Sequence, residues 1–536
     1  MEKILVSLRY IVKFIVHIQN ARVMNFTKGW KFAGRIRFKL LNTRIVIASL
    51  VLIGSIGFLW FRASRAKRPG KTDGSTGNPS IAVLPFTNVN NNPEGVYFSD
   101  GLAEDIRNDL ARIKGLKVCA RASSFHFRGK LTDVRQVGVQ LKANTLLEGS
   151  LQTVDDRIKV DLQLIDARTG DPVWTGEYSE NMENVGELQG RITRVIAQKL
   201  SIEPPVTSPP VPAAKSTHSK EAYACYLKGR AHWNLRTFSE LQKAIGLFRQ
   251  AIALDSVYAA AWSGVADCYT ALGYGSFMAP REAFPKALEA ATKALQMDST
   301  LAEPHASLGY YKFYYEWDWA AAEQEFRASI AKNANYELGY DWYGYYLTAM
   351  RRYDEARIIL QRAEELDPLS VAISTDMGFS FYYGGNYDQA ITALKASLQK
   401  NPRFGLAHLW LGRSYQAKKQ YPAAITEYKA TLETTAGWPV ALAAIGDVYG
   451  ESGQPELARR VLDTLGYLSS GRFVTAYGVA LVYAGLGEKE QAFAWLNKAF
   501  DERSNWLVWL KSDPRWAPIS RDARFAEMVN RVGLPK

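Results

Sequence analysis

Hydrophobic and polar positions follow three different patterns along the chain. An uninterrupted apolar run covers 45–61, after a stretch that is polar and basic. Between 79 and 202 the apolar residues switch between strand-like alternation and helical spacing, and from about 220 onward the helical spacing is sustained. This pattern predicts an α+β protein with a single transmembrane helix, a small α/β domain and a long all-α region.

In the 79–202 segment, the spacing of apolar residues predicts a mixed sheet with helices packed on it. Two helix-linked strands come before a meander of three strands, with turns at Asp155-Asp156 and Thr169-Gly170-Asp171. The residues between 203 and 219 are rich in proline and predict a semi-rigid linker. The spacing predicts strands over 80–86, 116–121, 145–154, 157–166 and 172–178, and helices over 97–114, 134–141 and 184–200.

From 220 to 505 the sequence repeats with a period of 34 residues. Small residues recur where two helices of one unit need to pack closely, and about eight copies are present. The pattern resembles the tetratricopeptide repeat and predicts a superhelical solenoid, with 506–536 capping its last unit. The markers in register are Gly344, Gly378 and Gly412, then Ala356, Ala390 and Ala424, then Pro368, Pro402 and Ala436.

The first helix of each unit normally lines the concave groove of such a solenoid. An aromatic groove with few charges suits an extended or helical peptide. The alternative is that these aromatic residues pack between neighbouring helices. The repeat register places these candidate partner-binding residues in the groove: Tyr310, Tyr314, Asp341, Tyr345, Phe379, Tyr383 and Arg413.

The apolar run 45–61 lies between Arg44 and Arg62 and has the length of a short membrane span. A buried core helix and a cleaved signal peptide are the alternatives, and the basic flanks and the late start disfavour them. More basic residues precede the run than follow it, which predicts a cytoplasmic N-terminus. We expect a single-pass protein of the bacterial inner membrane whose C-terminal domains are periplasmic.

Charge is concentrated at the N-terminal end. The formal net charge is +13, but fifteen Lys and Arg residues against Glu2 give +14 before position 72, so the remainder is near neutral. A chain that coats nucleic acid is therefore not expected. Residues 4–18 form a basic amphipathic pattern, for a membrane surface or for packing within the chain, and translation beginning at Met24 is a further alternative.

Motifs for catalysis, metal binding or cofactor binding are absent from the sequence. There is no phosphate-binding loop, no nucleophile elbow and no zinc-ligand spacing, so we expect a non-enzymatic protein without a cofactor. The stretch 123–130, which includes His126, is interpreted as a polar loop, with an anion site as the alternative. Asp100, Glu104 and Asp105 are interpreted as acids in the first turn of a helix and not as paired carboxylates.

The 79–202 segment contains the motifs AVLPF, FSDGL, SSF and LEGS. It resembles the TolB-like N-terminal domain joined to tetratricopeptide arrays in bacterial signalling proteins, a family related to CadC-like and cyclase-linked proteins. The stretch LVWLKSDPRWAPISRDARF resembles the C-terminal end of the same proteins. The resemblance implies an envelope protein, often with a cyclase, kinase or winged-helix domain before the membrane, for which residues 1–44 are too few.

The predicted organisation leads to two hypotheses. The first is a membrane-anchored scaffold or signal-input protein that binds proteins or peptides in its repeat groove. The second is a regulatory component of a transcription or cyclase system whose output domain is on another chain. The predicted regions are a basic tail (1–44), the membrane helix (45–61), a linker (62–78), the TolB-like domain (79–202), a second linker (203–219), the repeats (220–505) and the cap (506–536).

Overall fold

The computed structural model describes residues 79–536, apart from 91–92, 131, 155, 201, 203–216, 218, 234–235, 436 and 536. These residues belong to one compact unit, Gly77–Lys536. The predicted membrane span 45–61, the amphipathic segment 4–18 and most of the proline-rich linker lie outside the described residues. Within the described part, none of the helices has both the length and the apolar character that crossing a bilayer requires.

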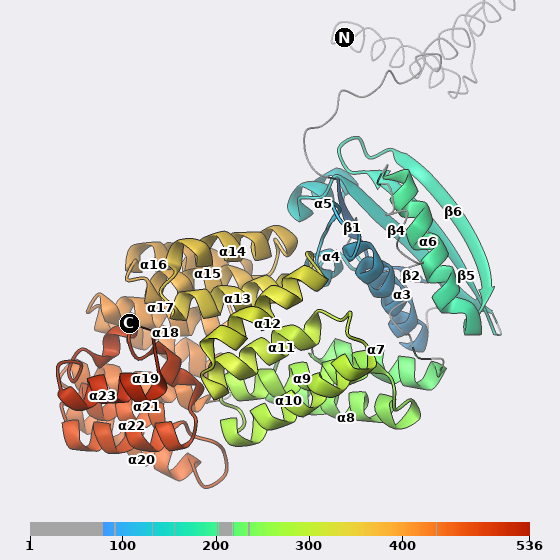
Figure 1. Cartoon of the computed structure of the whole chain (residues 1–536). Helices are drawn as coiled ribbons and strands as arrows, with labels where there is room; N and C mark the ends of the chain where they lie inside the picture. Colours follow the sequence, from blue (N-terminus) through green and yellow to red (C-terminus); the bar gives the residue numbers. More distant parts are fainter. Residues whose placement is uncertain are drawn as a thin grey trace, which may run out of the picture. The chain divides into compact units, whose positions relative to one another are not determined.

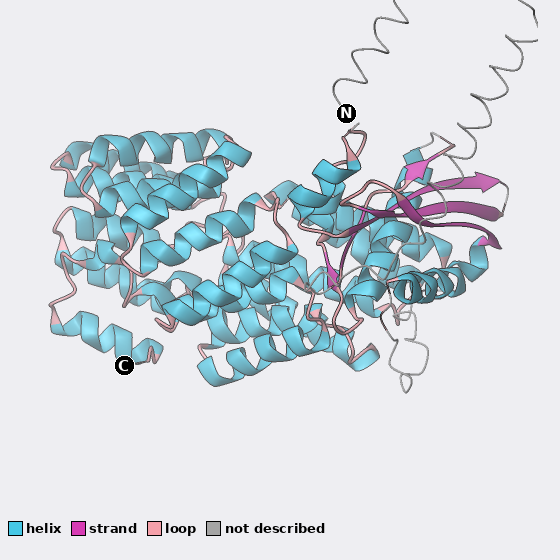
Figure 2. Ribbon diagram, turned by 90° about the horizontal axis from the view of Figure 1, so that it is seen from above, coloured by secondary structure: helices cyan, strands magenta, loops and turns pink. Residues whose placement is uncertain are grey.

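The α/β region near 80–181, with the helix that follows it, forms a mixed sheet with helices, as the hydrophobic pattern predicts (Figure 2). One short helix, α4, replaces the first part of the predicted polar loop. The elements are β1 (Ser80–Val83), β2 (Thr87–Asn88), α3 (Pro93–Ala111), β3 (Lys117–Val118), α4 (Arg121–Phe125), α5 (Val134–Leu141), β4 (Thr145–Val154), β5 (Arg157–Asp166), β6 (Pro172–Asn181), η1 (Met182–Asn184) and α6 (Val185–Lys199).

The strands are ordered β3-β1-β4-β5-β6, and β2 pairs with β4 off this path. β1 is parallel to both β3 and β4, whereas β4, β5 and β6 form the antiparallel meander. Alternate residues around β1 enter different cores because successive side chains of a strand point to opposite faces. Ile81 and Val83 pack with α3 and α6, and Ala82 and Leu84 pack with α5.

The rest of the described chain is helical and forms eight successive helix pairs, α7 to α22 (Figure 1). The π-helical turn η2 extends α11. The pairs are α7 (Lys220–Trp233) with α8 (Phe238–Leu254), α9 (Ala259–Tyr274) with α10 (Pro280–Met297), α11 (Glu303–Tyr311) and η2 (Lys312–Glu316) with α12 (Trp319–Lys332), α13 (Glu337–Ala349) with α14 (Tyr353–Leu366), α15 (Val371–Tyr383) with α16 (Tyr387–Lys400), α17 (Gly405–Ala417) with α18 (Tyr421–Thr434), α19 (Pro439–Glu451) with α20 (Pro455–Leu468), and α21 (Ala476–Gly485) with α22 (Lys489–Asp501).

A C-terminal segment follows the last pair. It consists of two short 3₁₀ turns and a final helix: η3 (Asn505–Trp509), η4 (Pro514–Trp516) and α23 (Ala523–Val532). We call residues 505–535 the cap.

The periodic glycines allow the two helices of each pair to approach closely. A methyl group at Gly344 would lie 2.5 Å from the side chain of Leu360, and one at Gly412 would lie 2.6 Å from the ring of Tyr428. Such distances are shorter than any ordinary carbon–carbon contact. The 34-residue spacing of glycine therefore follows from the packing of each first helix on the second.

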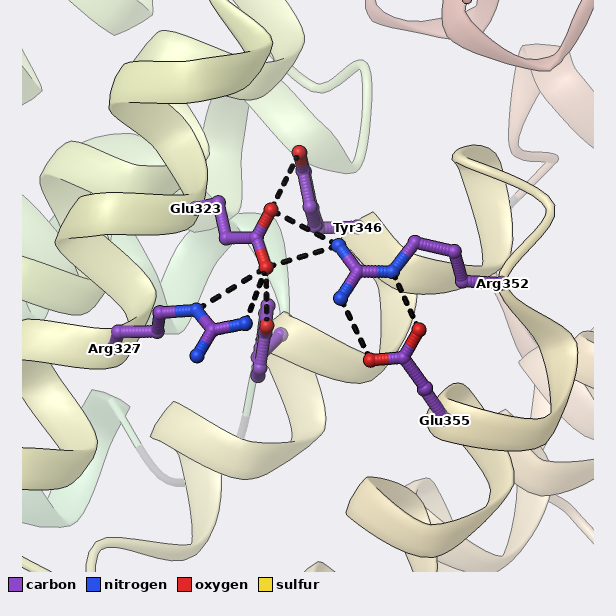
Figure 3. Close-up of polar contacts among 6 residues, drawn as sticks. Glu323, Arg327, Tyr346, Arg352 and Glu355 are labelled. Atoms are coloured by element: carbon purple, nitrogen blue, oxygen red, sulfur yellow. Dashed lines mark hydrogen bonds and ion pairs between the residues drawn. The ribbon is translucent and has the colours of Figure 1, made fainter.

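Neighbouring pairs are also joined by a polar network around Glu323 of α12 (Figure 3). Its carboxylate accepts hydrogen bonds from Arg327, from Tyr343 at 2.7 Å and from Arg352 at 2.9 Å. Arg352 in turn pairs with Glu355 at 2.6 Å. Burial opposes ionisation of Glu323, but these donors outweigh it and lower its pKa to about 2. The carboxylate is therefore ionised and connects α12 to α13 and α14.

Asn335, in the loop between α12 and α13, holds the α/β region with three hydrogen bonds. Its Oδ1 accepts from the backbone N–H of Val118 at 3.0 Å. Its Nδ2 donates to the carbonyl oxygens of Ala111 at 2.8 Å and Leu116 at 2.9 Å. All of these groups are buried, so one amide side chain satisfies three backbone groups that water cannot reach.

Asp367, which follows α14, makes the second attachment. Its Oδ1 accepts from the backbone N–H of Ser123 at 3.0 Å and also from the Ser123 hydroxyl. The same hydroxyl accepts from the backbone N–H of Leu369 at 2.8 Å. Ser123 is fully buried, and it belongs to the SSF motif. Part of the stretch that the sequence analysis interprets as a polar loop is therefore a buried interface.

Asn335→Ala is expected to destabilise the protein by about 2–4 kcal/mol, because a buried donor and two buried acceptors lose their partner. Urea unfolding of the full chain measures this loss. The matched control is Asn497→Ala, since Asn497 is exposed and accepts one hydrogen bond, from Arg531. Equal stability of the two variants would contradict the attachment role of Asn335.

Candidate functional site

A cavity of about 880 Å³ lies where the α/β region meets the inner side of the repeats. One wall comes from α3 and α4, and the others come from the first helices of the repeats, α7, α9, α11, α13 and α15. The loop between α9 and α10 and Trp438 also reach the cavity. Its volume is in the upper part of the range that is typical of small-molecule sites.

Two of the three acids that the sequence singles out, Glu104 and Asp105, line the cavity from α3, whereas Asp100 does not. Because α3 begins at Pro93, Asp100, Glu104 and Asp105 lie in its middle, and the prediction that they occupy the first turn is wrong. Burial would raise the pKa of Glu104, but Arg121, Arg230 and Arg107 outweigh it and lower that pKa.

Asp105 behaves in the opposite way to Glu104. Burial, the charge of Glu104 and the charge of Asp109 raise its pKa to about 8, even though the hydroxyl of Tyr223 donates a hydrogen bond to it. The carboxyl of Asp105 is therefore largely neutral at pH 7.

Two arginines flank the ring of Trp233 on the α7 side of the cavity. The guanidinium carbon of Arg230 lies 4.5 Å from the ring centre, and that of Arg236 lies 3.7 Å from it. Arg230 also contacts Asp267 at 3.4 Å. The guanidinium of Arg236 has no hydrogen-bond or ion-pair partner among the described residues, and the side chain is exposed to the cavity that it lines. Positive charge is thus held in place by an aromatic face.

Two carboxyl groups from neighbouring repeats meet in another part of the cavity wall. Asp341 of α13 and Asp376 of α15 are 4% and 6% exposed. Burial and the adjacent Asp376 raise the pKa of Asp341, which donates a hydrogen bond to Asp376. Asp376 also accepts from the hydroxyl of Tyr345. Within the described part of the chain, Oδ1 of Asp341 has no hydrogen-bond partner.

Aromatic rings form the wall between these charged groups. Tyr274 packs against Tyr310 and Tyr345, with ring centres 5.8 and 5.7 Å apart, and its hydroxyl donates to that of Tyr345 at 3.1 Å. The ring of Tyr310 lies 4.2 Å from that of Trp342. The cavity can therefore hold an organic group against flat apolar faces and offer it both acidic and basic side chains.

All seven groove candidates are buried. Tyr310, Asp341 and Tyr345 line the cavity, whereas the other four pack within the repeats and against the cap. Their positions agree with the alternative of packing between helices, and a partner-binding role stays a prediction. The exposed fractions are 2% for Tyr310, 0% for Tyr314, 4% for Asp341, 3% for Tyr345, 1% for Phe379, 3% for Tyr383 and 2% for Arg413.

The cap fills the middle of the concave groove. Trp509 stacks on Tyr383 with ring centres 4.3 Å apart and meets Phe379 edge-on at 4.9 Å. Arg413 lies between the rings of Trp410 and Trp506, at 4.3 and 4.9 Å. A peptide could reach these residues only if the cap moved out.

The insertion between α9 and α10 connects the cap to an early repeat. The carbonyl of Tyr274 accepts a hydrogen bond from Asn505 at 2.9 Å, and the hydroxyl of Ser276 accepts from Trp506 at 3.1 Å. The indole of Trp438 donates to the carbonyl of Gly275 at 2.9 Å. The loop between α9 and α10 therefore contacts both the cap and Trp438 of a later repeat.

His126, which belongs to the stretch predicted to be a polar loop, also lines the cavity. His126 is exposed and contacts the amino group of Lys130 at 2.8 Å. Cys119 and Cys268 are buried, and burial raises their pKa values. In the described part of the chain, no group of three His, Cys, Asp or Glu side chains is placed to hold a metal ion. Arg236 and Asp376 had no distinguishing signal in the sequence.

A family model described as a tetratricopeptide repeat matches residues 375–439, in the middle of the helical array. The prediction of a tetratricopeptide solenoid is therefore confirmed, and such repeats are typical of protein–protein interaction scaffolds. The TolB-like assignment of the α/β region stays a prediction.

A curated protein of Rhizobium meliloti (strain 1021), named "Putative adenylate cyclase 3", is 42% identical over 125 residues. The match covers 23% of this chain and 21% of that protein, so the chain spans about a fifth of the relative's length. The match therefore does not show what this chain does.

Solved structures with a similar arrangement of helices include Pseudomonas aeruginosa pilF, with 22% identity and a TM-score of 0.29 over 39% of this chain and 94% of that one. YrrB, described as a tetratricopeptide protein with an unusual peptide-binding site, has 20% identity and a TM-score of 0.24 over 37% and 96%. A human IFIT1 dimer with PPP-AAAA has 15% identity and a TM-score of 0.40 over 59% and 78%. At these scores the likenesses say nothing about what the chain binds.

Phe379→Ala is expected to cost about 3–5 kcal/mol of unfolding free energy, because it removes a buried ring from the contact between the repeats and the cap. Thermal and urea unfolding of the full chain check this loss. Phe238→Ala is the control, since its ring is 47% exposed. A small loss of unfolding free energy in Phe379→Ala would mean that this ring contributes little to the contact between the repeats and the cap.

Stability is expected to fall between pH 6 and pH 8, and Asp105 is expected to supply part of the fall. Its folded pKa of about 8 lies above the ordinary value of 3.8, so its contribution is complete below about pH 4 and is lost as the pH rises through 8. Asp105→Asn should remove about 2 kcal/mol of this pH dependence. Asp354→Asn, whose carboxylate is 96% exposed, should leave it unchanged.

Proposed function

We propose that this protein is a membrane-anchored, non-enzymatic scaffold or signal-input protein of the bacterial envelope, and that it recognises a partner in the cavity between its α/β region and its repeats. The carrying observation is the cavity of about 880 Å³, which is lined by both acidic and basic side chains. The cap already occupies the rest of the groove. The make-up of the cavity wall supports a recognition role. Its polar and aromatic side chains come from seven or more separate elements and not from one contiguous loop.

The TolB-like assignment supports a role in signalling. Two of the motifs behind that resemblance lie at the contact with the repeats: Ser123 of SSF bonds to Asp367, and Gly101 of FSDGL faces Leu227 of α7. A methyl group at Gly101 would lie 2.3 Å from that leucine. These motifs therefore have a structural reason to accompany a repeat array.

A second candidate function is a regulatory component of a cyclase or transcription system whose output is on another chain. The similarity to a protein named as an adenylate cyclase favours it. Deletion of residues 1–62 separates the two functions. A scaffold should still bind its partner without them, whereas a regulator should lose its signal even though the partner remains bound.

The membrane topology is tested by reporter fusions after Lys71 and after Lys536 in the full chain. We expect alkaline phosphatase to be active and β-galactosidase inactive at both positions, because the basic residues before 45–61 outnumber those after it. Activity of β-galactosidase alone at both positions would refute the periplasmic assignment.

Recognition in the cavity is tested by photo-crosslinking in living cells. Benzoylphenylalanine replaces Phe404, which lines the cavity and is partly exposed, or Ile358 on α14, which is 61% exposed. We expect an adduct of discrete mass from position 404 and none from position 358. An adduct from position 358 alone, or from neither, would overturn the proposal.

A further inference from the structure

The cavity has an acceptor end whose carboxyl groups form no ion pair among the described residues, although the charge of Arg236 favours their ionised forms. Asp341 and Asp376 lie together, and Oδ1 of Asp341 has no donor among the described residues although the side chain is 4% exposed. A buried acceptor without a donor costs free energy that a ligand can recover. An ammonium group has three N–H donors and a positive charge, and the two carboxyl groups can bind both. The rings of Tyr310 and Tyr345 can pack against the carbon atom that carries the ammonium group.

The cavity also has a donor end. The Nε of Arg107 has no acceptor in the described part of the chain, and this side chain is 8% exposed. The Nε of Arg230 is likewise without an acceptor there, and the guanidinium of Arg236 makes no hydrogen bond or ion pair in the same region. Guanidinium groups bind carboxylates with paired N–H donors.

The carboxylates that surround these arginines do not use all of the donors. Glu104 is ionised and pairs with Arg121 at 2.8 Å, and Asp267 is shared between Arg230 and the hydroxyl of Ser307. Burial raises the pKa of Asp267 to about 6 despite Arg230, so its negative charge is not strongly stabilised. Acceptors for the guanidinium of Arg236 and for the Nε groups of Arg230 and Arg107 are therefore left for a ligand to supply.

From these two ends we infer that the cavity binds a short peptide with free termini, its N-terminal ammonium at Asp341 and Asp376 and its carboxylate at Arg230 and Arg236. This inference rests on the proposed function, that the cavity is the recognition site. A simple amine or a simple anion would satisfy one end only, and a single amino acid would fill a small part of about 880 Å³. The aromatic wall between the ends suits peptide side chains.

The experiment uses the purified full chain and three pools of random tripeptides. One pool has free termini, the second is acetylated at the N-terminus and the third is amidated at the C-terminus. After rapid gel filtration, the peptides retained by the protein are measured by mass spectrometry. We expect retention of the free pool to exceed that of each blocked pool at least tenfold. Free amino acids form a fourth arm and should be retained less.

Two variants assign the ends. Asp341→Asn should lower retention of the free pool about tenfold, and Asp354→Asn, with its exposed carboxylate, is its matched control. Arg236→Gln should make the free and amidated pools bind equally, because the carboxylate loses its partner. Arg357→Gln, whose side chain is 50% exposed, is its control. Near-ultraviolet circular dichroism shows whether each variant is folded.

The comparison of pools on the unmodified chain does not depend on any variant being folded. Equal retention of all pools, or no retention above a denatured sample, would overturn the inference. Preferential retention of free amino acids would overturn the peptide assignment. Crosslinking from position 404 together with equal retention of the blocked pools would leave recognition in the cavity intact and refute only the ligand class.

Discussion

The attachment of the α/β region to two loops of the repeat array determines the rest of the arrangement. Asn335 satisfies three backbone groups of the α/β region, and Asp367 receives two donors from Ser123. These groups are buried, and a buried polar group without a partner costs free energy. The α/β region and the repeat array therefore fit together in the one register that pairs these groups. The cavity exists because this register places α3 opposite the inner helices without filling the space between them.

The cap limits which part of the concave surface can bind a partner. Solenoids need covered ends, and here the covering segment also enters the groove. Asp513 and Arg515 form a buried ion pair at 2.6 Å, and the hydroxyls of Tyr382 and Tyr477 donate to the same carboxylate. Removing one partner of such a pair would leave an uncompensated buried charge, so the cap is an integral part of the fold. The cap therefore leaves the cavity, and not the whole groove, open to a partner.

The sequence predicted elements well where the information is local. The helix over 134–141 and the strands over 145–154 and 157–166 have the predicted bounds, because apolar spacing and turn residues act over a few positions. Three of the seven groove candidates line the cavity, since repeat register assigns a face to each residue. The prediction that the acids of α3 lie in its first turn is wrong. The helix begins at Pro93, before the first residue of the apolar pattern from which its start was predicted.

The sequence by itself determined the solenoid and the mixed sheet. Each repeat is specified within 34 residues, and each strand by its own alternation. Only the tertiary structure decided that Ser123 meets Asp367, 244 positions away, that Trp509 fills the groove, and that Arg236 and Asp341 line one cavity. The physical reason is that these contacts depend on the accumulated curvature of many repeats and on pairing of buried polar groups. Neither property can be read from the spacing of neighbouring residues.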